Sequence, residues 1–280
     1  MKLALGTVQF GLDYGINNHN GLVAIDKVKK ILDLAKEKGI STLDTAAAYG
    51  RSEEVLGQVG INNYKIITKT TPLQNGVNEV IKNFYKSLSK LKVTQVEGLL
   101  IHNFNDIKDK KFDELFYKLN EIKKEGTIKK IGFSIYYPKQ VDFLLENFDF
   151  DLIQLPFNVF DIRLIEGGQL KALKKKNIEI HARSIFLQGV LLSFDSLPNY
   201  FSTWRKQFES YQEIVREKEL SLLEYALNFV SNTQELDKIL VGVDSVDQLT
   251  DIVNAFKFDA NLNAFKIDDI NLLNPDLWSK

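Results

Sequence analysis

Short apolar runs rich in β-branched residues alternate with longer charged segments along the chain. Strands buried on both faces have such runs, whereas amphipathic helices show apolar positions with a period near 3.6. The pattern predicts eight strands, at Leu3–Gly6, Thr42–Thr45, Lys65–Thr68, Val96–His102, Ile128–Ser134, Leu152–Leu155, Ile178–Ala182 and Lys238–Val241. The segments between them are expected to be helical, for example Asp26–Lys38, Asn78–Leu91, Phe112–Lys124, Pro138–Asn147 and Ser245–Phe256.

The segment IDKVKKILDLAKEKG shows the helical pattern most clearly. Its apolar side chains fall on one helical face, at Val28, Ile31, Leu32 and Ala35. Asp26 stands where an N-cap is expected, and Gly39 stands where a helix ends. We therefore expect a surface helix that packs one face against the sheet.

Eight strand-then-helix units in one chain predict an α/β fold with a parallel sheet. The number of units favours a closed (β/α)8 TIM barrel over an open doubly wound sheet. An open sheet that binds a dinucleotide normally has G-x-G-x-x-G after its first strand, and GTVQFG does not fit that spacing. One barrel of 280 residues has an ordinary size, so we expect residues 1–280 to form a single domain.

The composition of the chain argues against several classes of protein, among them nucleic-acid-binding, membrane-spanning and disulfide-bonded proteins. The 36 basic and 37 acidic residues nearly balance, so no global field attracts nucleic acid or an anionic membrane. There is no cysteine, which excludes disulfides, a thiolate nucleophile and a cysteine-bound metal. The start of the chain does not resemble a secretory signal, and no apolar stretch reaches the roughly 18–20 residues of a membrane span. We expect a cytoplasmic protein that binds neither nucleic acid nor membrane.

Four polar residues stand at or just after the ends of three adjacent predicted strands, at the barrel end where active sites form. They are Asp44 and Tyr49, Lys69, and His102. A phenol is a weak acid at neutral pH, but a nearby ammonium favours its phenolate, and a carboxylate can hold that ammonium. Such a relay could donate a proton to a carbonyl oxygen while hydride reaches the carbon, with the imidazole orienting the oxygen.

Each of these residues also has a purely structural interpretation. Asp44 could cap the following helix, and Tyr49 could be a half-buried aromatic. His102 could be a core histidine with satisfied hydrogen bonds. Lys69 could end a strand at the surface, although it follows a buried pattern in which an unpaired charge is costly. All four structural interpretations would have to hold together, so the catalytic interpretation is preferred.

The motifs around these residues resemble those of the aldo-keto reductase superfamily. The resemblance includes LDTAAAYG, Thr68–Lys69 and LLIH, followed in order by GFSIYYPKQV, IQLPFN, HARSIFLQGVLL and ILVGVDSVDQL. Each motif is weak alone, but the ordered set spans essentially the whole chain. The resemblance implies a (β/α)8 barrel that binds NADP or NAD without a Rossmann domain and without metal, and that is a monomer or weak oligomer.

The resemblance also implies roles for individual residues. Tyr49 would be the general acid, tuned by Lys69 and Asp44, and His102 would orient the carbonyl. Ser134 and Gln154 would hold the nicotinamide carboxamide. The full set expected at the cofactor is Thr7, Asp44, Ser134, Gln154, Arg183, Ser184, Phe186, Gln188, Gly242, Asp244, Gln248 and Asp251.

The chain departs from the family pattern at three places. Ile135 replaces the asparagine that usually follows Ser134, so one carboxamide hydrogen bond is either missing or supplied by another residue. Arg183 stands where an aromatic ring commonly stacks on the nicotinamide. The segment Val241–Gln248 has two aspartates and no basic residue, which suits a ribose 2′-hydroxyl better than the 2′-phosphate of NADP.

The substrate pocket is predicted from location. Aromatic residues in or near the loops of the catalytic face would suit a sugar-like carbonyl compound, unless they pack in the core: Tyr14, Tyr136, Tyr137, Phe157, Phe160 and Trp204. Arg163 and Arg183 could bind an anionic group. The irregular segment Leu191–Phe201 could be a lid over the substrate or an ordinary surface loop.

Two alternative functions follow from the same residues. In a Schiff-base aldolase, Lys69 would attack the substrate carbonyl, although a neighbouring Asp44 should keep the amine charged. A regulatory barrel would bind the cofactor with negligible turnover, which the four clustered polar residues argue against.

Overall fold

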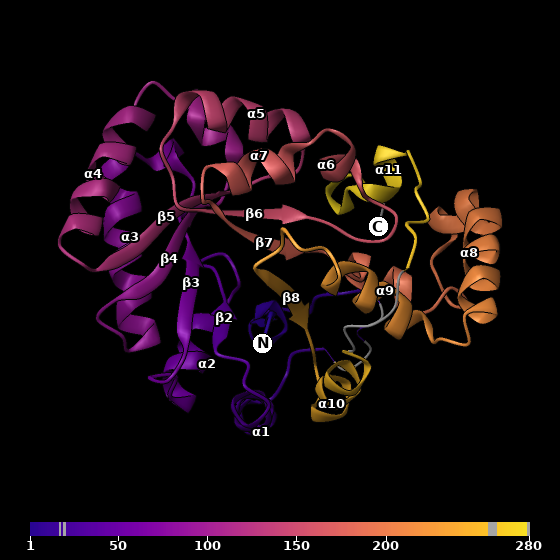
Figure 1. Ribbon diagram of the computed structural model, residues 1–280. Helices are drawn as coiled ribbons and strands as arrows, with labels where there is room; N and C mark the ends of the chain where they lie inside the picture. Colours follow the sequence, from indigo (N-terminus) through magenta and orange to yellow (C-terminus); the bar gives the residue numbers. More distant parts are fainter. Residues whose placement is uncertain (17, 19–20, 257–261, 279–280) are drawn as a thin grey trace.

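The computed structural model describes residues 1–16, 18, 21–256 and 262–278, and it confirms the predicted (β/α)8 barrel. Eight parallel strands pair in chain order and close with β1 against β8 (Figure 1). Their bounds are β1 Leu3–Gly6, β2 Thr42–Asp44, β3 Lys65–Lys69, β4 Val96–Ile101, β5 Ile128–Ser134, β6 Leu152–Pro156, β7 Glu179–Arg183 and β8 Lys238–Gly242.

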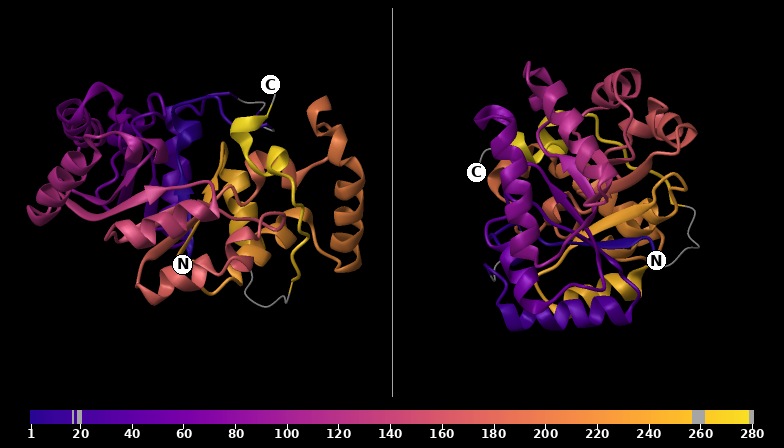
Figure 2. Two further views of the ribbon diagram at one scale, coloured as in Figure 1. Left: turned by 90° about the horizontal axis from the view of Figure 1, so that it is seen from above. Right: turned by 90° about the vertical axis from the view of Figure 1, so that its left-hand side faces the viewer.

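Helices surround the strands (Figure 2). Their bounds are α1 Ile25–Glu37, α2 Ser52–Val59, α3 Val77–Leu91, α4 Phe112–Lys124, α5 Pro138–Asn147, α6 Arg163–Glu166, α7 Gln169–Lys175, α8 Arg205–Glu217, α9 Leu222–Ser231, α10 Val246–Ala255 and α11 Ile270–Leu273. In the part of the chain described, none of these helices has the length and apolarity needed to cross a membrane.

The predicted apolar face of α1 is buried as expected, but its predicted N-cap is wrong. The helix begins at Ile25, and Ala24 occupies the cap position without a side-chain hydrogen bond. Asp26 instead lies within the first turn, where its negative charge favours the positive end of the helix dipole. Gly39 follows the helix with φ of +76°, a conformation that glycine adopts without strain.

Strand register decides which side chains point into the barrel. Side chains alternate between the two faces of a strand, and register partners share a face. Ile67, Leu100 and Leu152 come from three strands and form a buried apolar cluster of their own inside the lumen. Two residues further along each strand stand Lys69, His102 and Gln154. The lumen therefore has an apolar middle layer below a polar layer at the carboxyl ends of the strands.

The amino-terminal end of the lumen contains ion pairs. Lys130 on β5 contacts Glu97 at 2.7 Å and Glu179 on β7 at 2.6 Å. Because β6 separates β5 from β7 in the sheet, the second contact must cross the interior. The hydrogen bond from His181, together with Lys130, lowers the pKa of Glu179 to about 2. This cluster closes the barrel at the end opposite to the polar layer.

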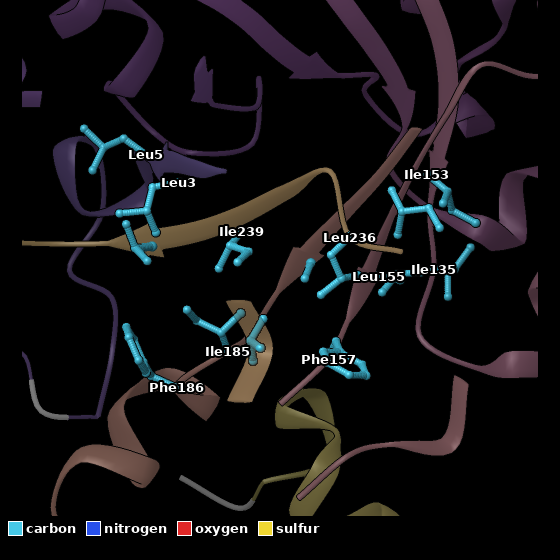
Figure 3. Packing of buried hydrophobic residues seen from close by; sticks show 14 of the residues in the cluster. Leu3, Leu5, Ile135, Ile153, Leu155, Phe157, Ile185, Phe186, Leu236 and Ile239 are labelled. Carbon is cyan, nitrogen blue, oxygen red and sulfur yellow. The ribbon is translucent and has the colours of Figure 1, made fainter. Parts of the chain in front are cut away.

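The larger apolar core lies between the strands and the surrounding helices. Figure 3 shows part of it, where Leu155 and Phe157 of β6 and the segment after it lie near Ile185 and Ile239. Phe157 and Phe160 are fully buried, and Phe160 packs edge-on against Tyr211. These two phenylalanines are therefore core residues and do not line the mouth of the barrel.

Candidate active site

The centre of the site is a buried ion pair. Lys69, the last residue of β3, lies with its Nζ 2.5 Å from Asp44 Oδ1, and both side chains are at most 3% exposed. The ammonium also donates to the backbone carbonyl of Thr45 at 2.9 Å. Parallel strands β2 and β3 are neighbours in the sheet, which places their carboxyl ends together. The pairing offsets the cost of burying either charge.

Gln154 extends this pair across the barrel. Its Nε2 donates to Asp44 Oδ2 at 2.7 Å, although the two residues are 110 positions apart in sequence. Both Asp44 oxygens are therefore engaged, one by an ammonium and one by an amide. The bond fixes the carboxylate in one orientation and leaves the Gln154 carbonyl oxygen for another partner.

Tyr49 lies in the turn between β2 and α2, and two glycines determine its position. A Cβ on Gly11 would lie 1.9 Å from the Tyr49 carbonyl oxygen, so only glycine permits this contact of backbones. Gly50 has φ of +54°, and a Cβ there would approach the Gly11 carbonyl at 2.3 Å. The loop after β1 thus packs directly against the loop that carries Tyr49.

The four predicted catalytic residues gather in one place. The Lys69 Nζ lies 4.9 Å from the centroid of the Tyr49 ring, and Tyr49 is among the groups that raise the pKa of this ammonium. The ring of His102 meets the Tyr49 ring edge-on, with centroids 6.2 Å apart. Tyr49 is half-buried, so its ring connects the buried ion pair to the open end of the barrel.

The charges around these residues set their protonation. Burial acts to lower the pKa of Lys69, but Asp44 and Tyr49 outweigh it and hold that pKa above the ordinary value. Burial, the Lys69 ammonium and Arg183 lower the pKa of His102 to about 4, against the opposing effect of Asp44. The site therefore combines a charged lysine with a neutral imidazole at neutral pH.

We expect a nuclear magnetic resonance titration to find the His102 ring neutral down to pH about 4. Between pH 6.5 and 4 the unfolded chain binds a proton at this residue that the folded chain does not. The free energy of unfolding should therefore fall as the pH drops through that window. A His102→Gln variant assigns the ring signals, and a midpoint near 6.5 would contradict the expectation.

Two predicted cofactor residues, Ser134 and Gln154, are register partners on β5 and β6 and lie in the polar layer. Within the described residues, neither the Ser134 hydroxyl nor the Gln154 carbonyl oxygen has a protein hydrogen-bond partner. Thr7 is different, because its hydroxyl donates to the Asp44 carbonyl at 2.9 Å and accepts from Ser52. The structure gives Thr7 a role in joining the loops after β1 and β2.

The loop after β7 carries three other predicted cofactor residues and has an unusual backbone. Ser184, Leu187 and Gln188 all have φ between +48° and +57°, which costs energy for residues other than glycine. Asn158 supports the loop by donating to the Ser184 carbonyl at 3.1 Å. Phe186 is buried, whereas Ser184 and Gln188 are partly exposed. Such strain is typical of ligand-binding loops.

The residues after β8 form a helix start. Ser245 caps α10 by accepting from the backbone of Gln248, and the Gln248 side chain accepts from the backbone of Asp244. Asp244 is buried, and its Oδ1 has no partner within the described residues. Gly242 and Asp251 are exposed. Gln248 is thus engaged in capping, while Asp244 has an acceptor to offer.

The remaining mouth residues divide into two groups. Tyr136 stacks against the Arg183 guanidinium, 4.1 Å from its ring centroid, at the carboxyl end of β7, and Tyr14 is an exposed tyrosine in the loop after β1. Trp204 is buried, with its indole donating to Asp269 at 3.1 Å. Arg163 is engaged by both oxygens of Asp161 at 2.7 Å, so it is not the free cation that the sequence suggested.

Sequence reasoning missed the contribution of the C-terminal segment to this rim. The side chain of Asn274 donates to the Tyr137 hydroxyl at 3.0 Å, and Asp276 hydrogen-bonds Tyr136. Figure 1 shows α11 near α6, on the side toward which β6 runs. No motif marks these residues, because their partners lie more than a hundred positions earlier.

Comparison with known proteins identifies the family. The model of the aldo/keto reductase family matches residues 2–274. The chain belongs to this family. Among named relatives, this aldo-keto reductase is 26% identical over 255 residues to the oxidoreductase YqkF of Bacillus subtilis, covering 82% of each chain. It is also 26% identical to L-galactose dehydrogenase of Arabidopsis thaliana, covering 84% of this chain and 79% of the relative.

Solved structures share the fold of this aldo-keto reductase. A holo-form aldo-keto reductase from Bacillus halodurans superposes with a TM-score of 0.72 at 22% identity, covering 93% of this chain and 87% of the other. A glycerol dehydrogenase from Gluconobacter oxydans superposes with a TM-score of 0.71 at 22% identity, covering 93% of this chain and 88% of the other. Together with the family match, the relatives make this protein an oxidoreductase.

Proposed function

We propose that this protein reduces an aldehyde or ketone to an alcohol with NADPH or NADH, and that Tyr49 is the general acid. The observation that carries the proposal is the buried Lys69 ammonium, held at 2.5 Å by Asp44 and set 4.9 Å from the Tyr49 ring centroid. A fixed cation at this position can stabilise the negative charge that remains on the tyrosine oxygen after it has given its proton to a substrate.

Each side chain then has a defined task. The nicotinamide, when bound, supplies hydride to the carbonyl carbon. The Tyr49 hydroxyl gives its proton to the carbonyl oxygen, and Lys69 stabilises the phenolate that remains. Neutral His102 donates an N–H to the same oxygen and holds it in position. Because Tyr49 is half-buried, solvent can return the proton to the phenolate.

The polar layer fits the nicotinamide by its chemistry. The Ser134 hydroxyl can donate to a carboxamide oxygen, and the Gln154 carbonyl oxygen can accept from the carboxamide nitrogen. At the adenosine end, the unpartnered Asp244 oxygen suits a ribose hydroxyl and repels a phosphate. We therefore expect NADH to bind at least as tightly as NADPH.

The alternative functions fit the geometry less well. A Schiff-base lysine must be a neutral amine to attack, and Lys69 is a buried ammonium whose pKa is raised. A regulatory barrel without turnover would not need a buried ammonium beside a half-buried tyrosine. Tyr14 and Tyr136, near the mouth of the barrel, each combine an apolar ring face with a hydroxyl group, which suits a sugar-like carbonyl substrate.

The test is to titrate purified protein separately with NADH and NADPH and to follow quenching of intrinsic fluorescence. Benzaldehyde is then added with the tighter nucleotide, and oxidation of the nicotinamide is measured. Binding with turnover supports the proposal. Binding without turnover of benzaldehyde, glyceraldehyde or any ketose would favour the regulatory barrel, and an adduct trapped by borohydride would favour the aldolase.

A further inference from the structure

Arg183 occupies an unusual position above the polar layer. It is the last residue of β7, and its register partner is Pro156 on β6. Its Nη2 donates to the backbone carbonyl of Ile135 at 3.0 Å, directly after β5. The side chain therefore reaches past the end of β6 and lies across the mouth of the barrel.

The guanidinium is held in a fixed plane. Its carbon lies 4.1 Å from the centroid of the Tyr136 ring, and Nη1 donates to the Ser184 hydroxyl at 3.2 Å. Stacking on an aromatic ring keeps a guanidinium partly desolvated without neutralising its charge. The strained φ of Ser184, at +57°, helps to define this position.

The charge of Arg183 has no acidic partner. Among the described residues, no carboxylate forms an ion pair with this guanidinium, whereas Arg163 is paired with both oxygens of Asp161. Asp276 is the acid near the stack, and it hydrogen-bonds the hydroxyl of Tyr136. Of the five N–H donors that an arginine carries, two bind acceptors among the described residues. Within the same part of the chain, the other three have no acceptor and are available to a ligand.

The position of this cation connects it to the chemistry. The Ile135 carbonyl that binds Arg183 belongs to the residue directly after Ser134, and the Ile135 N–H donates to the backbone carbonyl of Gln154 at 2.9 Å, so the guanidinium lies next to the polar layer. Its charge also contributes to lowering the pKa of His102. The same charge acts on Tyr14 at the rim. An anionic group bound to Arg183 and a carbonyl group held at Tyr49 could therefore belong to the same small molecule.

We propose that Arg183 is a specificity residue that binds an anionic group, a carboxylate or a phosphate, on the carbonyl substrate. The inference rests on the proposed function and adds the class of substrate to it. Arginine binds both groups through paired charge-assisted hydrogen bonds, and its stacked plane fixes their direction. The preferred substrate is then a small carbonyl acid or a phosphorylated carbonyl sugar.

The experiment compares matched pairs of substrates with the nucleotide-loaded protein. The pairs are 4-carboxybenzaldehyde against benzaldehyde, and glyceraldehyde 3-phosphate against glyceraldehyde. The wild-type protein should show a higher kcat/KM for the anionic member of at least one pair, and the pair identifies the anion. In Arg183→Gln, that ratio should fall by about 10–100-fold, as expected when a charged hydrogen-bonding partner is lost.

Two controls make the result decisive. Arg216→Gln removes an equal charge from the exposed last turn of α8 and should leave the ratio unchanged. Fluorescence titration of Arg183→Gln with NADH and NADPH tests whether the arginine serves the cofactor phosphates instead. Weaker nucleotide binding with an unchanged substrate ratio would overturn the inference, as would equal kcat/KM within both wild-type pairs. Neither outcome would affect the proposed function, which depends only on reduction of a carbonyl compound with oxidation of the nicotinamide.

Discussion

Replacing Tyr49 by phenylalanine is expected to reduce kcat by about 10²–10⁴-fold, the usual contribution of a positioned general acid. The ring stays, so its edge-on contact with His102 and its position over Lys69 are retained. Only the hydroxyl, which supplies the proton, is lost. Steady-state reduction of benzaldehyde measures the rate, and fluorescence titration measures nucleotide affinity, which should remain close to that of the wild type.

The matched control is Tyr117→Phe, which removes the same hydroxyl from the exposed face of α4. This variant should reduce benzaldehyde at the wild-type rate. If Tyr49→Phe kept full activity, the proton would come from another group and the proposed mechanism would be wrong. A loss of nucleotide binding in the same variant would point to a binding role for the tyrosine.

Replacing Lys69 by methionine is expected to abolish activity and to lower the free energy of unfolding by about 3–5 kcal/mol. The change leaves the Asp44 carboxylate buried without its ammonium, and Gln154 alone cannot neutralise it. Denaturant unfolding followed by circular dichroism measures the stability. Activity is measured under conditions in which the variant remains folded.

The double variant Asp44→Asn/Lys69→Met separates the two effects. Removing both charges takes away the unpaired ion, so most of the lost stability should return. Activity should not return, because the tyrosine still lacks its cation. Recovery of activity in the double variant would show that the ion pair serves only the fold.

The strands of the barrel could be predicted closely because their signal is local. Leu3–Gly6 and Ile128–Ser134 match the observed strands at both ends. Helix α9, Leu222–Ser231, gives a weaker signal, because almost every residue from Tyr225 onward is buried and the apolar period disappears. The N-cap of α1 was misplaced for another reason: an aspartate in the first turn is stabilising whether or not it caps the helix.

The candidate catalytic residues could be placed together from the sequence because strand ends converge at one face of a barrel. Their partners could not be predicted, since the bond from Gln154 to Asp44 depends on strand register and closure. The position of Phe157 could not be predicted either, because a residue just after a strand can turn toward the helices as readily as toward the mouth of the barrel. Phe157 is buried in the core. Tertiary contacts also decide which arginine is available to an anion: among the described residues Arg163 pairs with Asp161, and Arg183 pairs with no carboxylate.

The ion pairs of Lys130 and the apolar layer of Ile67, Leu100 and Leu152 fill the barrel beneath the polar residues. A molecule that reacts at Tyr49 therefore enters and leaves through the same end of the barrel, at the carboxyl ends of the strands. The ligand that occupies the deeper position must bind before the other ligand and dissociate after it. The filled interior of the barrel therefore favours a fixed order of binding and release for the two reactants.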